Sequence, residues 1–451
     1  MRFNPARLNG TMPRQISLRA PVPFSLSPGL VASSAVLGLG LIPQIGTLGV
    51  LVFFVLSSAL IFTRPAFNLR QLGRFSPLLI LPVLAIFSTL WSDAPQRSLR
   101  LGLELLGTFA AAIVISRNLR LERLLAMLFT VCAFGALVWA PAIPGSVVSG
   151  QPLGGNAFKN PIGFNGFMLS TLALSMLVDR AQPVAFRFCA LLMLPLGIIT
   201  AKLSQSGGGA TSLALTLILF PPLALIGSVR LPIRVALAVF SVLLVAVATL
   251  FMTDITNAVT TFRSGVLNKD ATLTGRTHLW EFASRLSAER PLLGHGYSAF
   301  WRQGNVDAEG LWRWAGIASR TGFNFHNEFV EMRVDLGWVG VVLLALTCAV
   351  IATGAVMRQI AAPRIALATL ITIVIAIYAR SYVEDGLVAP FSVLTVLWLA
   401  TFVYAVLPGV GIDEDLGGRR NLRQARQLRF IKRYSPAVGR TRGVDSLADQ
   451  C

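Results

Sequence analysis

The sequence predicts an all-α, polytopic integral membrane protein that carries one large folded loop. Hydrophobic residues make up 54% of the 451 residues and charged residues only 13%, about half the charged share of a typical soluble domain. This composition excludes a soluble enzyme, and its apolar content excludes a disordered chain. The apolar residues form long continuous runs rather than the alternating pattern of barrel strands. Helices are therefore expected, because an open strand leaves its backbone unsatisfied in lipid.

Twelve apolar runs approach the length of about 20 residues that a helix needs to cross a bilayer. Together they take up over half of the chain, which agrees with its composition. The predicted spans are residues 26–42, 45–62, 76–91, 100–116, 121–140, 161–178, 186–201, 208–228, 232–252, 336–356, 364–379 and 388–407.

The net charge of +19 would indicate a nucleic-acid partner on a soluble chain, but its distribution indicates membrane orientation instead. Twelve basic residues lie in one set of five short loops, and five lie in the opposite set. The positive-inside rule makes the first set cytoplasmic. Both termini fall on that same side, as an even number of spans requires. A multi-pass protein with both termini in the cytoplasm and no nucleic-acid partner is therefore expected.

The spans and charges divide the chain into five parts. The predicted parts are a cytoplasmic N-tail at 1–25, spans one to nine at 26–252, an outward loop at 253–335, spans ten to twelve at 336–407 and a basic cytoplasmic tail at 408–451. The four cysteines have no metal-type spacing and indicate no disulfide framework.

The loop at 253–335 has the composition of a folded cap rather than of a linker. It holds all three histidines and four of the eight tryptophans. Helical spacing runs from Leu279 to Leu286 before Pro291 stops it, and a second short amphipathic helix is expected near His326. Loops of this length are usually functional when they are not disordered.

Three aromatic side chains of this cap are candidates for a site. His326 lies where the loop re-enters the membrane, and an imidazole titrates near neutral pH, which suits a general base. A hydrogen-bonded structural role is the alternative. For His295, which lies between two glycines, a structural role is favoured over catalysis. Trp280 belongs to a tryptophan cluster that could stack on sugar rings or form an interfacial belt.

Basic side chains at the same level indicate a phosphate-bearing substrate. The loop is rich in arginine, the residue that grips phosphate with two hydrogen bonds. Lys159 precedes the sixth span, and Arg380 and Glu384 follow the eleventh. Ionisable groups at such positions are functional candidates by default. An arginine-rich cavity above an apolar bundle would suit a lipid-linked pyrophosphate.

Seven motifs occur in order between about residues 80 and 400. They are Trp91-Ser92 with Pro95, Phe158-Lys159-Asn160, Ser204-Gln205-Ser206, Gly275-Arg276 with Trp280, Arg290-Pro291-Leu292-Leu293-Gly294-His295-Gly296, His326-Asn327, and Arg380-Ser381 with Glu384. In this order they resemble the O-antigen ligase/polysaccharide polymerase (Wzy/WaaL-like) superfamily, and within it the ExoQ-type exopolysaccharide polymerase branch. One departure is Gly207, because many members have arginine directly after the serine of that turn.

The resemblance implies a GT-C-like, metal-independent glycosyltransferase that faces the periplasm from the bacterial inner membrane. Its donor would be an undecaprenyl-pyrophosphate-linked oligosaccharide, with no cofactor. His326 would deprotonate the attacking sugar hydroxyl, and Arg276 would neutralise the leaving group. The outward loops contain no Asp-x-Asp motif to hold a divalent ion. The further substrate-binding candidates are Lys159, Asn160, Arg380, Glu384, Asn327, His295 and Trp280.

Three functions stay open at this stage. The first is a polymerase that joins lipid-linked repeat units into exopolysaccharide. The second is an O-antigen ligase that transfers glycan to a lipid A core or another acceptor. The third is a lipid-linked sugar transporter, which the absence of two-halves symmetry disfavours. The expected partners are the lipid-linked oligosaccharides, membrane lipid and a protein that regulates chain length.

Overall fold

The computed structural model describes residues 27–237 and 275–407 of the chain. Within these two ranges the protein is helical and contains no strand, which confirms the predicted all-α class. Both predicted tails, most of the ninth predicted span at 232–252 and residues 253–274 of the loop lie outside the described residues.

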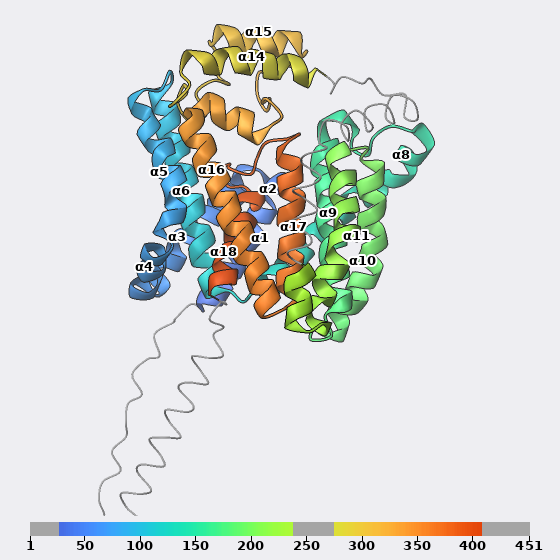
Figure 1. The fold of residues 1–451 in the computed structure, drawn as a ribbon. Coiled ribbons are helices and arrows are strands. Elements are labelled where there is room, and N and C mark those ends of the chain that lie inside the picture. Colours follow the sequence, from blue (N-terminus) through green and yellow to red (C-terminus); the bar gives the residue numbers. More distant parts are fainter. Residues whose placement is uncertain (1–26, 238–274, 408–451) are drawn as a thin grey trace, which may run out of the picture.

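The N-terminal part of the bundle pairs α1 with α3 and places α5 against α6. The helices α3 and α4 are bent by 106° relative to each other, so α4 turns away from the bundle axis (Figure 1). This part consists of α1 (Pro28–Gly40), α2 (Ile42–Ile45), α3 (Thr47–Thr63), α4 (Pro65–Arg74), η1 (Ser76–Leu79), α5 (Ile80–Phe87), η2 (Ser88–Leu90) and α6 (Pro95–Asn118).

The middle part is centred on α9, which packs against α7, α10 and α11. Small residues allow this close packing: a Cβ on Gly166 of α9 would lie 2.6 Å from the backbone nitrogen of Ala201 on α10. This part consists of α7 (Leu121–Trp139), η3 (Ala140–Ala142), α8 (Ile143–Ser149), α9 (Gly155–Val178), α10 (Val184–Leu203), α11 (Gly207–Leu225) and η4 (Ile226–Ser228).

The C-terminal part closes the bundle. Helix α17 packs against both α11 and α9, while α18 packs against α6 and α16. The cap helices α14 and α15 lie across one end, and α4 lies at the other (Figure 1). This part consists of α14 (Arg276–Glu289), α15 (Val306–Trp314), α16 (Glu328–Ala361), α17 (Ile365–Ser381) and α18 (Val393–Val406).

Six helices in the described ranges are long and apolar enough to cross a membrane, or seven if α3 and α4 count as one bent span. The other apolar segments are shorter: α1, α17, α18 and residues Ser76–Leu90. Some apolar runs include 3₁₀ turns or are interrupted by a break between two helices. The α-helices in these runs are therefore shorter than the length needed to cross a bilayer. The multi-pass class is supported, and the count of twelve stays a prediction.

The cap has a small hydrophobic core of its own. Trp301 packs within about 6 Å of the rings of Phe300, Phe325 and Trp312. Among the four tryptophans of the cap, Trp314 is the exposed one, at 50%. The described tryptophans therefore serve mainly to fold the cap, which leaves little of the predicted stacking surface for sugars.

Helix α16 bends at Gly337, whose φ of 63° breaks the helical path. The bend frees two backbone donors, and the cap segment supplies acceptors for them: Trp338 N donates to Pro291 O at 2.9 Å and Val339 N to Leu292 O at 3.2 Å. A side chain at Gly337 would clash with the backbone of Leu292. The predicted amphipathic helix near His326 is the part of α16 before this bend, and it fixes the cap to the bundle.

Candidate active site

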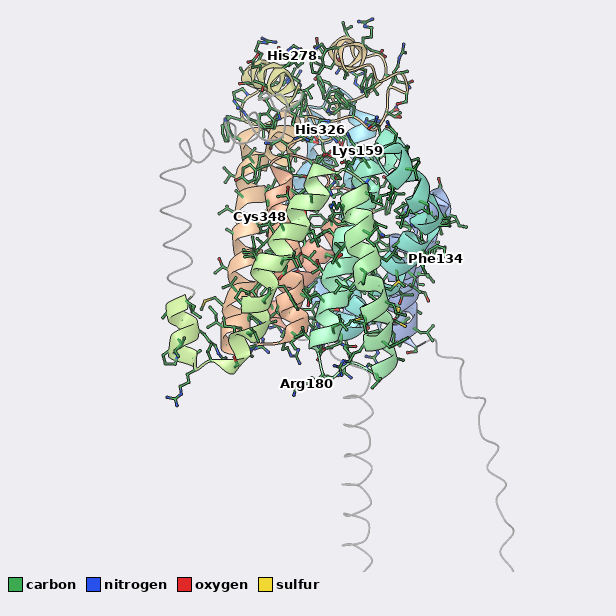
Figure 2. The ribbon with its side chains drawn as sticks, turned by 90° about the vertical axis from the view of Figure 1, so that its right-hand side faces the viewer. Phe134, Lys159, Arg180, His278, His326 and Cys348 are labelled. Atoms are coloured by element: carbon green, nitrogen blue, oxygen red, sulfur yellow. The ribbon has the colours of Figure 1, made fainter. Side chains whose placement is uncertain are left out.

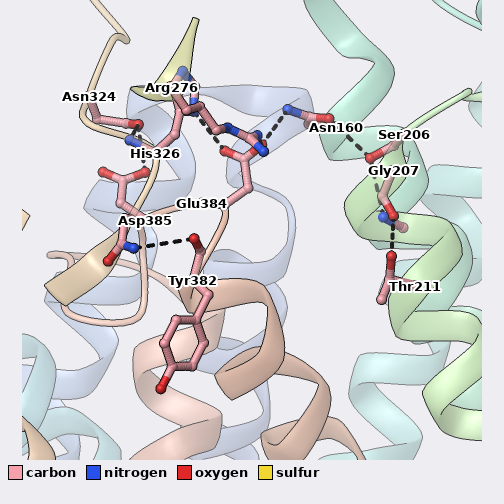
Figure 3. A network of polar contacts seen from close by, with 12 residues as sticks. Asn160, Ser206, Gly207, Thr211, Arg276, Asn324, His326, Tyr382, Glu384 and Asp385 are labelled. Carbon is pink, nitrogen blue, oxygen red and sulfur yellow. Dashed lines mark hydrogen bonds and ion pairs between the residues drawn. The ribbon is translucent and has the colours of Figure 1, made fainter. Parts of the chain in front are cut away.

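Glu384 is the centre of a polar network that joins four distant parts of the chain (Figure 3). Asn160 Nδ2 donates to Glu384 Oε1 at 3.1 Å, and the guanidinium of Arg276 reaches the same oxygen at 3.4 Å. The other carboxylate oxygen, Oε2, lies 3.3 Å from His326 Nδ1. Three residues from three separate motifs therefore meet at the carboxylate of Glu384, which belongs to a fourth motif.

Each of these residues is positioned by the end of a helix. Asn160 lies near the start of α9, and Glu384 follows the end of α17, which packs against α9. Arg276 is the first residue of α14. It follows Gly275, whose φ of 80° places the backbone against the ring of Trp314, where a Cβ would come within 2.7 Å. The network is thus built where the helices of the bundle meet the cap.

The backbone of His326 holds a left-handed conformation, with φ of 52°. Such a conformation costs energy in a non-glycine residue and persists only where the surroundings specify it. Here Asn324 supplies the constraint: its Oδ1 accepts from His326 N at 2.8 Å, and its Nδ2 donates to Asp385 Oδ1 at 2.5 Å. Asn324 therefore connects the histidine turn to the segment that carries Glu384.

The carboxylate of Glu384 determines which nitrogen of His326 can act as a base. An ionised carboxylate only accepts hydrogen bonds, so Nδ1 carries the hydrogen in this pair. In the neutral ring, Nε2 is then left with the free lone pair, as in other carboxylate–histidine pairs of catalytic sites. The His326 side chain is 26% exposed, which allows a ligand to reach it.

Two adjacent carboxyl groups have pKa values shifted in opposite directions. Burial alone would raise the pKa of Glu384, but the hydrogen bond and charge of His326, together with Arg380 and Arg276, hold this pKa below its ordinary value. Burial and the negative charge of Glu384 raise the pKa of neighbouring Asp385. Glu384 is therefore the carboxylate that stays ionised beside the histidine.

The depressed pKa of Glu384 predicts a loss of stability in acid. Ionised Glu384 stabilises the fold above the pKa of an unfolded glutamate, about 4.3, and this contribution disappears as pH falls through the lower folded-state pKa. We expect the difference in melting temperature between wild type and Glu384→Gln to be constant from pH 7 to 5. It should shrink toward pH 3. A difference that is independent of pH down to 3 would contradict the assignment.

Ser206 extends the network from α9 to α11. Its hydroxyl donates to Asn160 Oδ1 at 3.0 Å and caps α11 by accepting from Gly209 N at 3.2 Å. Glycines make this approach possible, because a Cβ on Gly163 of α9 would lie 2.5 Å from that of Ser206, and one on Gly209 would lie 2.8 Å from Gly163. The turn at Ser204-Gln205-Ser206 thus holds Asn160 in place.

Two predicted cations lie near the network without bonding to Glu384. The guanidinium of Arg380 lies 5.2 Å from the ring centre of Phe164, and its buried Nε and Nη1 have no hydrogen-bond partner among the described residues. Lys159 is half-buried, next to Asn160, and lies at the same end of the molecule as His326 (Figure 2). Both are available to an anionic ligand.

Comparison with known proteins agrees with the motifs. The family model described as O-antigen ligase matches residues 189–345. The predicted resemblance is confirmed. The exopolysaccharide production protein ExoQ of Rhizobium meliloti (strain 1021) is 28% identical to this chain over 338 residues, which cover 72% of this chain and 76% of the relative. The chain is therefore similar to the O-antigen ligase family over residues 189–345 and to an exopolysaccharide production protein over most of its length, and its long apolar helices agree with a multi-pass membrane protein.

The network extends beyond the matched O-antigen ligase region. Ser206, Arg276 and His326 lie within residues 189–345, whereas Asn160 and Glu384 lie outside them. Glu384 is therefore contributed by the C-terminal helices and Asn160 by α9. The site is complete only when α9 and the segment after α17 pack against the matched residues 189–345.

Three predicted substrate-binding residues lie outside this network and hold the structure together. Asn327 caps α16 through Phe329 N at 2.9 Å and donates to Tyr382 O at 3.3 Å. Trp280 Nε1 donates to Phe325 O at 2.9 Å. His295 is buried at 5% exposure. Its two ring nitrogens lie 2.9 Å from Asp93 Oδ2 and 3.1 Å from Leu286 O. Direct substrate contact by these three stays a prediction.

Sequence reasoning missed Glu328, the buried first residue of α16. Its carboxylate accepts from three consecutive backbone amides, those of Gly386 and Leu387 at 2.8 Å and of Val388 at 3.1 Å. These amides directly follow Glu384 and Asp385 in the chain. The signal that could have found Glu328 is its place beside His326-Asn327, an acidic residue at the entry to an apolar helix. Glu328 thus joins the turn at His326 to residues 386–388, which follow Glu384.

Proposed function

We propose that this chain is an inner-membrane polymerase that joins undecaprenyl-pyrophosphate-linked oligosaccharide repeat units into exopolysaccharide on the periplasmic side. The observation that carries the proposal is the contact of His326 Nδ1 with Glu384 Oε2 at 3.3 Å, in the same network as Arg276. A base oriented by a carboxylate thus lies beside a cation that can bind phosphate. Glycosyl transfer from a pyrophosphate needs both groups.

In the proposed reaction, one sugar hydroxyl attacks the first sugar of the donor. The hydroxyl oxygen forms a bond to the anomeric carbon while His326 Nε2 takes the hydroxyl proton. The bond between the anomeric carbon and the pyrophosphate oxygen breaks, and its electron pair leaves with undecaprenyl pyrophosphate. Glu384 is the positioning residue that stabilises the resulting imidazolium, because it lies on the opposite side of the ring.

Arginine and lysine side chains supply the charge that the leaving group needs in this proposal, without a metal ion. Arg276 contacts Glu384 at 3.4 Å and can exchange that contact for a phosphate oxygen. Arg380 has two buried N–H groups without partners among the described residues. A guanidinium matches the geometry of phosphate, and Lys159 adds a third positive charge from α9.

The periplasmic orientation rests on charge. The network lies at the cap end of the bundle, whereas Arg180 lies at the opposite end (Figure 2). That end carries the arginine-rich short loops which the positive-inside rule assigns to the cytoplasm. The lipid-linked donor would therefore enter from the outer leaflet, beneath the cap.

A ligase is the second candidate, because the matched family is described as O-antigen ligase. The similarity to an exopolysaccharide production protein over most of the chain favours the polymerase. Deleting the protein in its own bacterium distinguishes the two by glycan analysis. We expect single-repeat lipid-linked units to accumulate and polymer to be lost. Full-length polymer retained on its lipid carrier would instead establish a ligase, and unchanged glycans would contradict both.

A further inference from the structure

A half-open apolar groove of about 410 Å³ lies far from the network, between α5, α16 and α18. This volume lies in the range of sites that hold small ligands, about 300–1,000 Å³. Its walls include Ile80 on α5 and Leu346 and Val350 on α16, all at least half-exposed, and Phe402 on α18 forms part of its lining. The groove therefore presents hydrocarbon to the surrounding bilayer.

The groove offers no free hydrogen-bonding group along its apolar length among the described residues. Apart from Arg74, the one polar residue of its lining is Thr347. The hydroxyl of Thr347 donates to Leu343 O of its own helix at 2.7 Å. A sugar or a peptide would leave its own polar groups unpaired there. An aliphatic chain has no polar group to leave unpaired, so the lining suits an acyl chain.

Arg74 lines the groove, and it belongs to α4, which lies at the end of the bundle opposite the cap (Figure 1). It is the last residue of α4, is exposed, and has no hydrogen bond or ion pair among the described residues. Buried hydrogen bonds hold α4, and with it the backbone of Arg74, against α6. Asn68 accepts from Asn118 at 2.7 Å, and Gln71 accepts from Arg117 at 3.1 Å. The lining of the groove thus includes a positioned cation.

We infer that the groove binds an anionic glycerophospholipid of the leaflet on the α4 side, with one acyl chain in the groove and its phosphate on Arg74. The bend of 106° between α3 and α4 supports this, because it places α4 at the end of the bundle opposite the cap (Figure 1), which the positive-inside rule assigns to the cytoplasm and where the head groups of the inner leaflet are expected. Arginine at that depth attracts anionic lipid, by an amount that corresponds to about fivefold in affinity for each charge. The undecaprenyl donor is a poorer fit, because the proposed transfer site lies at the opposite end.

Native mass spectrometry of the purified full-length protein tests the proposal. The protein is titrated with phosphatidylglycerol or phosphatidylethanolamine of identical acyl chains. We expect tighter retention of phosphatidylglycerol by the wild type. Arg74→Gln should weaken that retention about fivefold, and Leu346→Trp, which fills the groove from an exposed position, should reduce binding of the first lipid at least as much.

Two matched variants control for general effects on lipid binding. Arg180→Gln removes an exposed arginine from the same end, on a different face (Figure 2), and Leu191→Trp enlarges a lipid-facing residue of α10 that does not line the groove. Both should bind phosphatidylglycerol like the wild type. Equal retention of the two lipids by the wild type would overturn the proposal. So would wild-type retention in Arg74→Gln or Leu346→Trp, or an equal loss in either control.

Discussion

Replacing His326 with alanine is expected to lower the rate of polymer formation roughly 100-fold or more, the contribution usual for a general base. The reason is geometric: Glu384 occupies Nδ1, so Nε2 is the nitrogen that can accept the proton of the attacking hydroxyl. The measurement is the rate at which purified protein extends a lipid-linked repeat unit in vesicles, at saturating donor and acceptor. Because Arg276 and Arg380 are untouched, the apparent affinity for donor should change far less than the rate.

His278→Ala is the matched control for this prediction. His278 belongs to the same cap, but its ring packs on Trp314 at 4.6 Å and makes no contact with Glu384. We expect this variant to retain wild-type activity. Equal losses of activity in His278→Ala and His326→Ala would indicate damage to the cap, and full activity in His326→Ala would refute the assigned base.

Replacing Glu328 with alanine is expected to lower the free energy of unfolding by about 2–3 kcal/mol, at about 1 kcal/mol for each buried or part-buried amide that loses its acceptor. The variant leaves the amides of Gly386, Leu387 and Val388 without their acceptor. It also releases the segment that follows Glu384, so activity should fall even where the protein remains folded. Thermal and denaturant unfolding in detergent, followed by circular dichroism, measure the change.

Glu328→Gln separates the hydrogen bonds of this residue from its size, because the amide keeps one accepting oxygen. We expect an intermediate loss of stability. Glu289→Ala, an exposed position at the end of α14, should change the free energy of unfolding by no more than about 0.5 kcal/mol. A loss in Glu328→Ala that is no larger than in this control would mean that the three amides find other acceptors.

The sequence predicted the parts of this protein that depend on local signals. The helical class follows from continuous apolar runs, and the helix of the cap before Pro291 follows from apolar spacing and a stop residue; α14 indeed ends at Glu289. The number of spans was harder to predict, because an apolar run does not reveal where a helix breaks. The run that is predicted as one span at 76–91, for example, consists of η1, α5 and η2.

The pairing within the site was not predictable from one sequence by local physics. Asn160 and Glu384 are separated by 224 positions, and their contact depends on the packing of α9 against α17. Motif resemblance selected both residues as candidates but could not say that they touch. Glu328 lies directly beside the His326-Asn327 motif, but a carboxylate at the first turn of a helix is ordinarily only a favourable charge, so its position alone did not single it out. Its role follows from the backbone amides brought to it by another part of the chain.

The glycines after Ser206 illustrate a departure from the family that the structure explains in part. The motif resemblance leads us to expect arginine directly after Ser206, where this chain has Gly207. Gly209 allows α11 to approach Gly163, and Ser206 uses that proximity to hold Asn160. The packing explains why residue 209 is glycine. At Gly207 a Cβ would meet no atom within 4 Å, so packing does not explain that glycine. In the proposed mechanism, Arg380 and Lys159 bind the phosphate in place of the arginine that is expected after Ser206.

Glycan transfer from a lipid pyrophosphate by the Glu384 network can be measured by incubating the purified protein in vesicles with an undecaprenyl-pyrophosphate-linked repeat unit and a chelator. Extended glycan and released lipid pyrophosphate are then counted together. For this mechanism we expect one lipid pyrophosphate to be released for each glycosidic bond formed, at the same rate with and without chelator, and both products to be lost in His326→Ala. Release without glycan extension, or activity that requires a divalent metal ion, would contradict it.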